Sequence, residues 1–152
     1  MNQKIEPKIK RKAPHKFKNM KQNNLPDLCP CGSKKSYTRC CQIAHNGTPA
    51  KTAEALMRSR YSAFVLGLRD YLLLSWHSST RPRKDDLRMD DNTNWLGLKV
   101  LSTAQGQVGD STGTVEFVAR YKNNGKATRI EEVSEFVFEN GQWFYVKGKE
   151  KA

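Results

Sequence analysis

The amino-acid sequence predicts an α+β domain, in which N-terminal helices pack on a curved antiparallel sheet, preceded by a small cysteine-rich element. Apolar residues recur at helical spacing between residues 53 and 68, and from Asn94 onward the apolar period changes to two. Helices followed by a run of strands are typical of α+β proteins, where a helical stripe covers one face of the sheet. All four cysteines lie within thirteen consecutive positions before these helices. At 152 residues the chain is long enough for one well-buried domain and a small appendage.

The cysteines are spaced as Cys-x-Cys, eight intervening residues and Cys-Cys, at positions Cys29, Cys31, Cys40 and Cys41. Four sulfurs complete the tetrahedral coordination that zinc prefers. The spacer contains a glycine, which allows a tight turn, and basic residues, which offset the surplus negative charge of four thiolates around a divalent cation. Because a closed tetrahedron leaves no position for a reacting water, we predict one structural zinc ion and a structural or docking role.

Disulfide bonds and free or redox-active thiols are the alternatives to zinc. Adjacent cysteines bond to each other only through a strained ring, and a bridge from Cys29 to Cys31 is nearly as awkward. The N-terminal segment has no apolar stretch that could form the core of a signal peptide, and no apolar run could span a bilayer, so a reducing cytoplasm is the simpler setting. His45 lies four residues after Cys41 and is either a surface histidine or a nitrogen ligand that displaces this cysteine.

The chain carries a net charge of +12 with only 37% hydrophobic residues, so its partner is expected to be an acidic protein, a nucleic acid or the ribosome. Residues 1–28 hold eight lysine or arginine residues against two acidic ones. We predict that this segment is a disordered basic tail, because it cannot bury enough apolar surface to offset the entropy of ordering. Such a tail serves solubility or contacts phosphates through counterion release.

A first helix is predicted to start at Thr48 or Thr52. Its buried apolar stripe consists of Ala53, Leu56, Met57, Tyr61, Phe64, Val65 and Leu68. Gly67 can close or bend this helix, and Asp70 can cap a second short one. A polar stretch follows from residue 78 to residue 91, with one helical turn expected near residues 85–89.

The residues after Asn94 alternate with the period of two that is typical of strands. Strands are predicted around residues 95–100, 114–121, 129–138 and 143–146. Hairpin turns are predicted at Asn123-Asn124-Gly125 and at Asn140-Gly141, because Asn-Gly pairs adopt the backbone twist that joins antiparallel strands. We therefore predict a meander of three or four antiparallel strands.

Two parts of the sequence resemble known families. The segment from Cys29-Pro30-Cys31-Gly32-Ser33 to Cys40-Cys41 resembles the SEC-C motif, named for the zinc-binding tail of the bacterial preprotein translocase ATPase. The remainder resembles the YchJ family, a bacterial family without an established reaction, through a series of short motifs: Thr52 to Phe64, Asp70 to Leu73, Trp76-His77, Ser79 to Pro82, Trp95 to Leu98, Phe117 to Tyr121 and Gly141 to Trp143. The resemblance implies a SEC-C zinc element at residues 29–47 and an NTF2-like domain, a conical α+β fold, at residues 48–148, between tails at residues 1–28 and 149–152.

The chain departs from the family pattern at a few positions. Relatives generally have a second glycine where this chain has Lys34 and proline where it has Ser78, and neither position is a predicted zinc ligand. Many relatives have His-Glu where this chain has Glu131-Glu132. This difference weakens the case for acid–base catalysis by a histidine and carboxylate pair at that place.

The cone of an NTF2-like domain typically opens into a pocket, and the resemblance implies one here. The face of the third strand that would point into the cone consists of Ile130, Glu132, Ser134 and Phe136. Glu132 would then be a buried carboxylate, with candidate partners Arg58, Arg60, Arg120 and His77. An enzyme would use Glu132 or His77 as a general base, with Tyr61 or an arginine stabilising developing negative charge. Alternatively, an arginine–glutamate ion pair fixes the helix to the sheet.

The sequence favours a cytoplasmic interaction module, in which the zinc element and basic tail dock on a protein, the ribosome or RNA and the NTF2-like domain is a scaffold. In a second version the SEC-C element docks on an acidic chaperone. The alternative is an NTF2-like enzyme or small-molecule-binding protein with Glu132, Arg60, Tyr61 and His77 around its pocket. The three tryptophans are predicted to be core residues rather than base-stacking platforms. No membrane partner is expected, and a homodimer through the open face of the sheet is compatible with the fold.

Overall fold

The computed structural model describes residues 25–151 and confirms the α+β prediction. In chain order the helical elements are η3 (Tyr37–Arg39), α2 (Cys41–His45), α3 (Ala53–Leu66), α4 (Arg69–Leu74) and η4 (Lys84–Asp86). The strands that follow are β1 (Thr93–Gln105), β2 (Thr112–Asn123), β3 (Lys126–Glu139) and β4 (Gln142–Glu150). They form one antiparallel sheet in the order β1-β2-β3-β4, which is the predicted meander.

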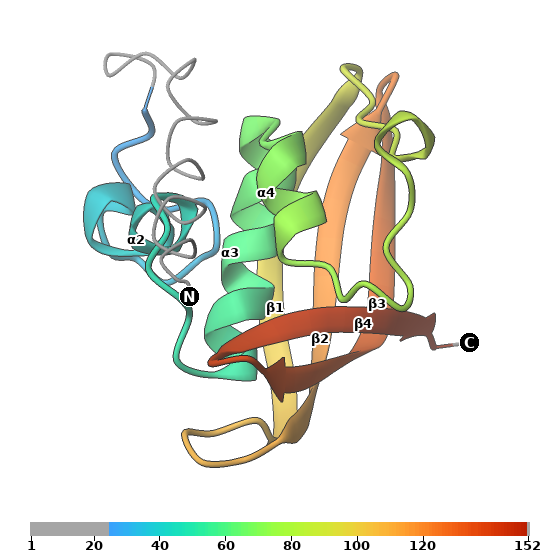
Figure 1. Cartoon of the computed structure of the whole chain (residues 1–152). Coiled ribbons are helices and arrows are strands. Elements are labelled where there is room, and N and C mark those ends of the chain that lie inside the picture. Colours follow the sequence, from blue (N-terminus) through green and yellow to red (C-terminus); the bar gives the residue numbers. More distant parts are fainter. Residues whose placement is uncertain (1–24, 152) are drawn as a thin grey trace.

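Helix α3 lies at the centre of the molecule, with the cysteine-rich segment on one side and the sheet on the other (Figure 1). The first part of its predicted stripe is buried against the sheet, where Leu56, Met57 and Tyr61 join the core formed with Val115 and Phe136. The last part is only half-buried, and Phe64 and Leu68 pack against Tyr71 and Leu72 of α4 instead. Polar residues outside the stripe are also buried: Ser62 contacts Cys29, Ser59 contacts Tyr71 of α4, and Arg60 lies between α4 and β4. The apolar stripe alone could not predict this second buried face.

The ends of α3 follow local chemistry. Thr52 is the residue before the helix, and its side-chain oxygen accepts a hydrogen bond of 3.0 Å from the backbone N–H of Ala55. Of the two predicted starts, Thr52 is therefore the one that the structure uses. Gly67 ends the helix in the left-handed conformation, with φ of 75°, which a residue without a β-carbon adopts at little cost.

The prediction that Asp70 caps the next helix was wrong. Leu68 precedes the first residue of α4, and its side chain makes no capping hydrogen bond. Asp70 lies one position inside the first turn, where its negative charge still interacts favourably with the helix N-terminus. The expected turn near residues 85–89 is present as the 3₁₀ turn η4, at Lys84–Asp86.

The sheet is joined by the two predicted hairpin turns. Asn124-Gly125 and Asn140-Gly141 all have positive φ, between 53° and 83°, which is the conformation of the two-residue turns that asparagine and glycine favour. Strand β4 continues to Glu150, beyond the boundary expected at residue 148, because residues 149 and 150 pair with β3. Figure 1 shows β4 turned away from the direction of β1 to β3, so that the sheet curls.

Strand β1 contains two irregularities that decide which of its residues face the core. The pairing with β2 skips Leu96 and Leu101, and both side chains are exposed, by 44% and 41%. An extra residue in a strand shifts the alternation of its side chains. As a result Trp95, Leu98 and Val100 all pack against the core, although they do not share a strict period of two.

The cysteine-rich segment begins earlier than predicted. Leu28 pairs with Ser36, and the backbone N–H of Tyr37 donates to the carbonyl of Asp27 at 3.1 Å. These two residues of the predicted tail therefore belong to the cysteine-rich element, and residues 1–24 of the tail lie outside the described residues. Within residues 25–151, no helix has the length and apolar character needed to cross a membrane.

Candidate metal centre and cone pocket

The four cysteines lie together at the junction of the turn before η3 and the start of α2. Their sulfur atoms are all within 4.8 Å of one another, and the Sγ atoms of Cys31 and Cys40 are 3.6 Å apart. Cys29, Cys31 and Cys41 are buried and Cys40 is half-buried. The predicted ligand set is thus brought into one cluster that is able to hold a metal ion.

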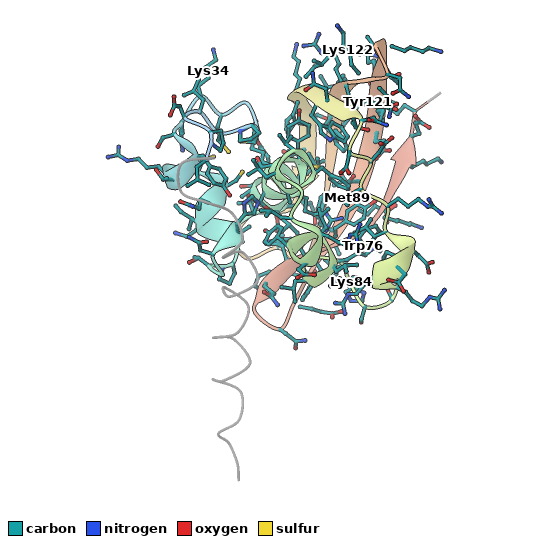
Figure 2. All side chains as sticks on the ribbon, turned by 90° about the horizontal axis from the view of Figure 1, so that it is seen from above. Lys34, Trp76, Lys84, Met89, Tyr121 and Lys122 are labelled. Carbon is teal, nitrogen blue, oxygen red and sulfur yellow. The ribbon has the colours of Figure 1, made fainter. Side chains whose placement is uncertain are left out.

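The turn between the two halves of the cluster depends on two left-handed residues. Gly32 has φ of 83° and Lys34 has φ of 71°, and the chain then returns so that the Cys29 N–H donates to the carbonyl of Lys35 at 2.8 Å. A residue with a β-carbon is strained in this region, whereas glycine is not. This is the physical reason why a glycine suits position 34. Figure 2 shows Lys34 at the outer end of the cysteine-rich element, pointing away from the domain.

Polar groups from α3 and from the turn contact the cluster. The hydroxyl of Ser33 lies 3.1 Å from the Cys40 sulfur, and that of Ser62 lies 3.5 Å from the Cys29 sulfur. Arg58 donates to the carbonyl of Cys31 at 2.8 Å and so attaches the element to α3. Hydrogen bonding with Cys29 lowers the pKa of Cys31, which favours the thiolate form of this buried sulfur.

His45 is neither a metal ligand in this arrangement nor a surface residue, because it is 1% exposed and both of its ring nitrogens have partners. Its Nε2 lies 2.8 Å from the carbonyl oxygen of Ser59, which can only accept, so Nε2 carries the proton. Its Nδ1 then accepts from the hydroxyl of Tyr37 at 2.6 Å. Burial lowers the pKa of His45 to about 4. The histidine connects α2 to α3, and the alternative in which His45 displaces Cys41 as a ligand is not the arrangement of this site.

A cavity of about 260 Å³ lies between α3 and the inner face of the sheet. The predicted face of β3 points into it, since Ile130, Glu132 and Ser134 line its wall. Arg60 and Tyr61 line the wall that α3 provides. Three of the four predicted pocket residues are therefore brought together.

His77, the fourth predicted pocket residue, is not in the lining. Its Nε2 bonds to Glu139 at 3.0 Å and its Nδ1 to the hydroxyl of Ser79 at 2.7 Å. Trp76 pairs with Tyr145 of β4, and in an extended segment consecutive side chains point to opposite sides. Trp76 therefore faces the cavity and His77 faces away from it, so the prediction of His77 as a pocket base was wrong.

The buried Arg60 does not form the ion pair that was the alternative for this site. Its Nη1 donates to the carbonyl of Leu72 at 2.7 Å and to the hydroxyl of Ser75 at 2.6 Å, which holds the end of α4. Its guanidinium carbon lies 4.3 Å from the ring centre of Tyr145 and 4.9 Å from that of Trp76. Burial lowers the pKa of Arg60 to about 10.

Glu132 has no ion-pair partner among residues 25–151. Of its candidate partners, Arg58 bonds to Glu54 at 2.9 Å and Arg120 is exposed. Burial raises the pKa of Glu132, and the nearby charge of Glu150 adds to this effect. A half-buried carboxylate of this kind can accept a hydrogen bond or, once protonated, donate one.

The pocket walls include residues that the sequence analysis did not assign to a site. Tyr145 and Trp76 are in edge-to-face contact, with ring centres 5.1 Å apart, and both line the cavity. Trp95 lines it too and also packs on the core, whereas Trp143 is buried in the core as predicted. The pairing of Trp76 with β4 spans a large stretch of chain, so the local sequence pattern carries no signal for it.

A curved sheet that encloses a pocket against one long helix, preceded by a four-cysteine cluster, defines an NTF2-like domain with a SEC-C element. The family model described as YchJ, middle NTF2-like domain, matches residues 52–148, and the SEC-C motif matches residues 26–43. The chain therefore belongs to the YchJ family, and the resemblance found in the sequence is confirmed.

Relatives and solved structures agree with this assignment. A UPF0225 protein of Chromobacterium violaceum is 49% identical over 125 residues, which cover 79% of this chain and 90% of that protein. One from Cupriavidus metallidurans is 52% identical over 131 residues, covering 81% and 89%. The solution structure of a SEC-C motif containing protein from Rhodopseudomonas palustris matches with a TM-score of 0.69 at 33% identity, covering 82% of this chain and 99% of that one. A crystal structure from Psychrobacter arcticus, also of a SEC-C motif containing protein, matches with a TM-score of 0.63 at 26% identity, covering 82% and 83%.

Proposed function

We propose that the cysteine cluster holds one structural zinc ion and that the zinc-bound element docks on an acidic protein surface. Zinc–sulfur bonds of about 2.3 Å in a tetrahedron place the sulfurs about 3.8 Å apart. The separation of 3.6 Å between the Cys31 and Cys40 sulfurs fits this geometry, and the 4.8 Å limit for all four leaves only small adjustments. Four free thiols at this spacing also favour a reducing compartment such as the cytoplasm.

The observation that carries the docking proposal is the surface chemistry of the cysteine-rich element. Residues 29–47 contain three basic side chains, Lys34, Lys35 and Arg39, all exposed, and no acidic residue. Large aliphatic side chains are exposed on the same element, with Leu28 at 62% and Ile43 at 48%. Basic groups beside exposed aliphatic groups complement a partner that offers carboxylates and apolar contacts. The basic residues 1–28 add charge of the same sign.

An acidic protein explains this surface better than a nucleic acid does. Proteins that bind single-stranded nucleic acid present aromatic rings on which bases stack. The aromatic residue of this element, Tyr37, is only 1% exposed and bonds to His45, so no ring is offered there. The pocket lies on the other side of α3, between that helix and the sheet, so docking through the cysteine-rich element leaves it open.

Binding by the full-length, zinc-loaded protein tests the proposal. Two fluorescein-labelled probes are compared across a salt series by anisotropy: a peptide of alternating glutamate and leucine, and a single-stranded RNA. The variant carries Lys35→Glu and Arg39→Glu, and a matched control carries Lys122→Glu and Lys126→Glu, which change the net charge equally. Figure 2 shows Lys34 of the cysteine-rich element and Lys122 on separate parts of the molecule. Zinc content is measured for each protein, so that loss of the metal is distinguished from loss of the docking charges.

We expect the peptide to bind and the variant in the cysteine-rich element to bind it roughly tenfold more weakly, because two charge reversals remove about 1–2 kcal/mol of attraction. The control variant should lose far less affinity for the peptide. Equal losses in the variant and the control would refute a docking site on this element. Binding of the RNA in preference to the peptide would instead identify a nucleic acid as the partner.

A further inference from the structure

The cone pocket is lined by two side chains, Arg60 and Trp76, that have hydrogen-bond donors without a partner among residues 25–151. Arg60 is 5% exposed, and both of its hydrogen bonds leave from Nη1, so its Nε and Nη2 have no partner in this part of the chain. Trp76 lines the same pocket, and its indole Nε1 is buried without an acceptor among the described residues. An unsatisfied buried donor costs about 1–3 kcal/mol. A ligand that brings an acceptor into the pocket would remove part of this cost.

The pocket also contains a positive charge without a negative partner. The described residues place no carboxylate in an ion pair with Arg60, although Glu132 lines the same cavity. The rings of Tyr145 and Trp76 compensate the charge only in part. Because the pKa of Arg60 remains at about 10, the guanidinium is charged at neutral pH. The missing partner is therefore an anion.

The other residues that line the pocket indicate the apolar part and the size of the anionic ligand. Phe64, Trp95 and Phe117 supply aromatic surface, and Met57 adds an aliphatic thioether that adapts to flat ligands. The cavity of about 260 Å³ lies just below the ~300 Å³ at which ligand pockets commonly begin, so the ligand is small. Glu132 offers an acceptor on the sheet wall.

We propose that the cone pocket binds a small aromatic carboxylate, whose carboxylate group bonds to the guanidinium of Arg60 and whose ring lies against the aromatic walls. Glu132 accepts a hydrogen bond from a hydroxyl on the ring, which favours hydroxylated ligands. Planar bidentate recognition of a carboxylate is what arginine provides and lysine does not. This site is separate from the docking element and does not depend on that proposal.

Titration of the unmodified full-length protein is the first test. The probes are para-hydroxybenzoate and its neutral analogue para-hydroxybenzamide, and isothermal titration calorimetry measures their affinities. We expect saturable binding of the carboxylate and binding of the amide that is at least about tenfold weaker, because a charge-assisted hydrogen bond is worth about 1.5–3 kcal/mol. Equal affinities, or no saturable binding of the carboxylate at millimolar concentration, would overturn the proposal.

Two variants locate the ligand. Arg60→Met removes the charge with little loss of volume, and Arg120→Met removes the same charge from an exposed position as a matched control. Because Arg60 also holds the end of α4, Trp76→Phe provides a second variant, which removes the Nε1 donor and keeps an aromatic ring. We expect Arg60→Met to weaken para-hydroxybenzoate binding at least about tenfold and Trp76→Phe to weaken it about threefold or more, with Arg120→Met unchanged. Unchanged affinity in Trp76→Phe, or an equal loss in both arginine variants, would contradict the assignment.

Discussion

Replacement of Lys34 by glycine is expected to stabilise the cysteine-rich element. Lys34 has φ of 71°, in the left-handed region, and its side chain is exposed. It follows Cys31 by three residues and lies in the turn that brings the two halves of the cluster together. Strain at this residue therefore acts directly on the geometry of the four sulfurs.

The magnitude follows from two opposing effects. A β-carbon in the left-handed region costs about 1–2 kcal/mol. Replacing lysine by glycine removes this strain, but it also stabilises the unfolded state by about 0.4–1 kcal/mol, because glycine makes the unfolded chain more flexible. The net stabilisation is therefore about 0.5–1 kcal/mol, which corresponds to a two- to fivefold change in an equilibrium constant.

The rate at which a chelator removes the metal from the folded protein measures this effect, because removal requires the turn to open. Lys34→Gly should slow removal about two- to fivefold at a fixed chelator concentration. Lys34→Ala is the matched control, since it removes the charge and keeps the strained β-carbon. Gly32→Ala should accelerate removal, because its φ is 83° and a β-carbon there would lie 3.1 Å from the carbonyl oxygen of Leu98.

If Lys34→Gly and Lys34→Ala release the metal at the same rate, the effect belongs to the charge and the argument from backbone strain is wrong. The three variants together therefore separate backbone conformation from electrostatics at one turn.

Three further outcomes are expected. Cys31→Ser should lose the metal, which is measured as loss of thiolate-to-cobalt absorption in the cobalt-substituted protein. Circular dichroism should still show the signal of the sheet, since the main core does not include the cysteine cluster. His45→Phe should retain one metal ion per chain, measured by elemental analysis, but lower the free energy of unfolding in urea by about 1–3 kcal/mol, because Tyr37 loses its buried partner; loss of the metal would show that His45 is a ligand after all. Glu132→Gln should raise the free energy of unfolding at pH 7, because burial raises the pKa of Glu132 and its ionised form is disfavoured in the folded protein. This advantage should shrink as the pH falls through the folded pKa towards the unfolded value of about 4.3, where the wild-type carboxyl is protonated in both states; an advantage independent of pH would exclude this cause.

The features that depend on neighbouring residues could be predicted well from the sequence. The cysteine spacing predicted the cluster, the Asn-Gly pairs predicted both hairpin turns, and Gly67 predicted the end of α3. Each of these features depends on backbone conformations, or on distances, within a few residues of the chain. The change of apolar period from helical to two likewise predicted the α+β class, because each period belongs to one kind of element.

Apart from the Asp70 cap, the predictions that failed depended on contacts between distant segments. His45 was left as either a surface residue or a ligand, because its bonds to Tyr37 and Ser59 form only when α2 packs on α3. The side to which His77 points depends on the pairing of Trp76 with Tyr145, far away in the chain. The partners of Arg60 come from α4 and β4, and no local sequence pattern predicts these contacts.

By itself, the sequence determined the fold class and the four clustered cysteines, since short-range spacing and periodicity encode both. The face of β3 that lines the pocket followed from the alternation of its residues together with the family resemblance. Only the tertiary structure decided that Trp76 would hold a buried donor without an acceptor, and that Arg60 and Glu132 would line the same cavity without an ion pair among residues 25–151. The physical reason is that α3 is covered on two sides. Its apolar stripe specifies the contact with the sheet, but the burial of its other residues depends on segments that fold against it from elsewhere in the chain.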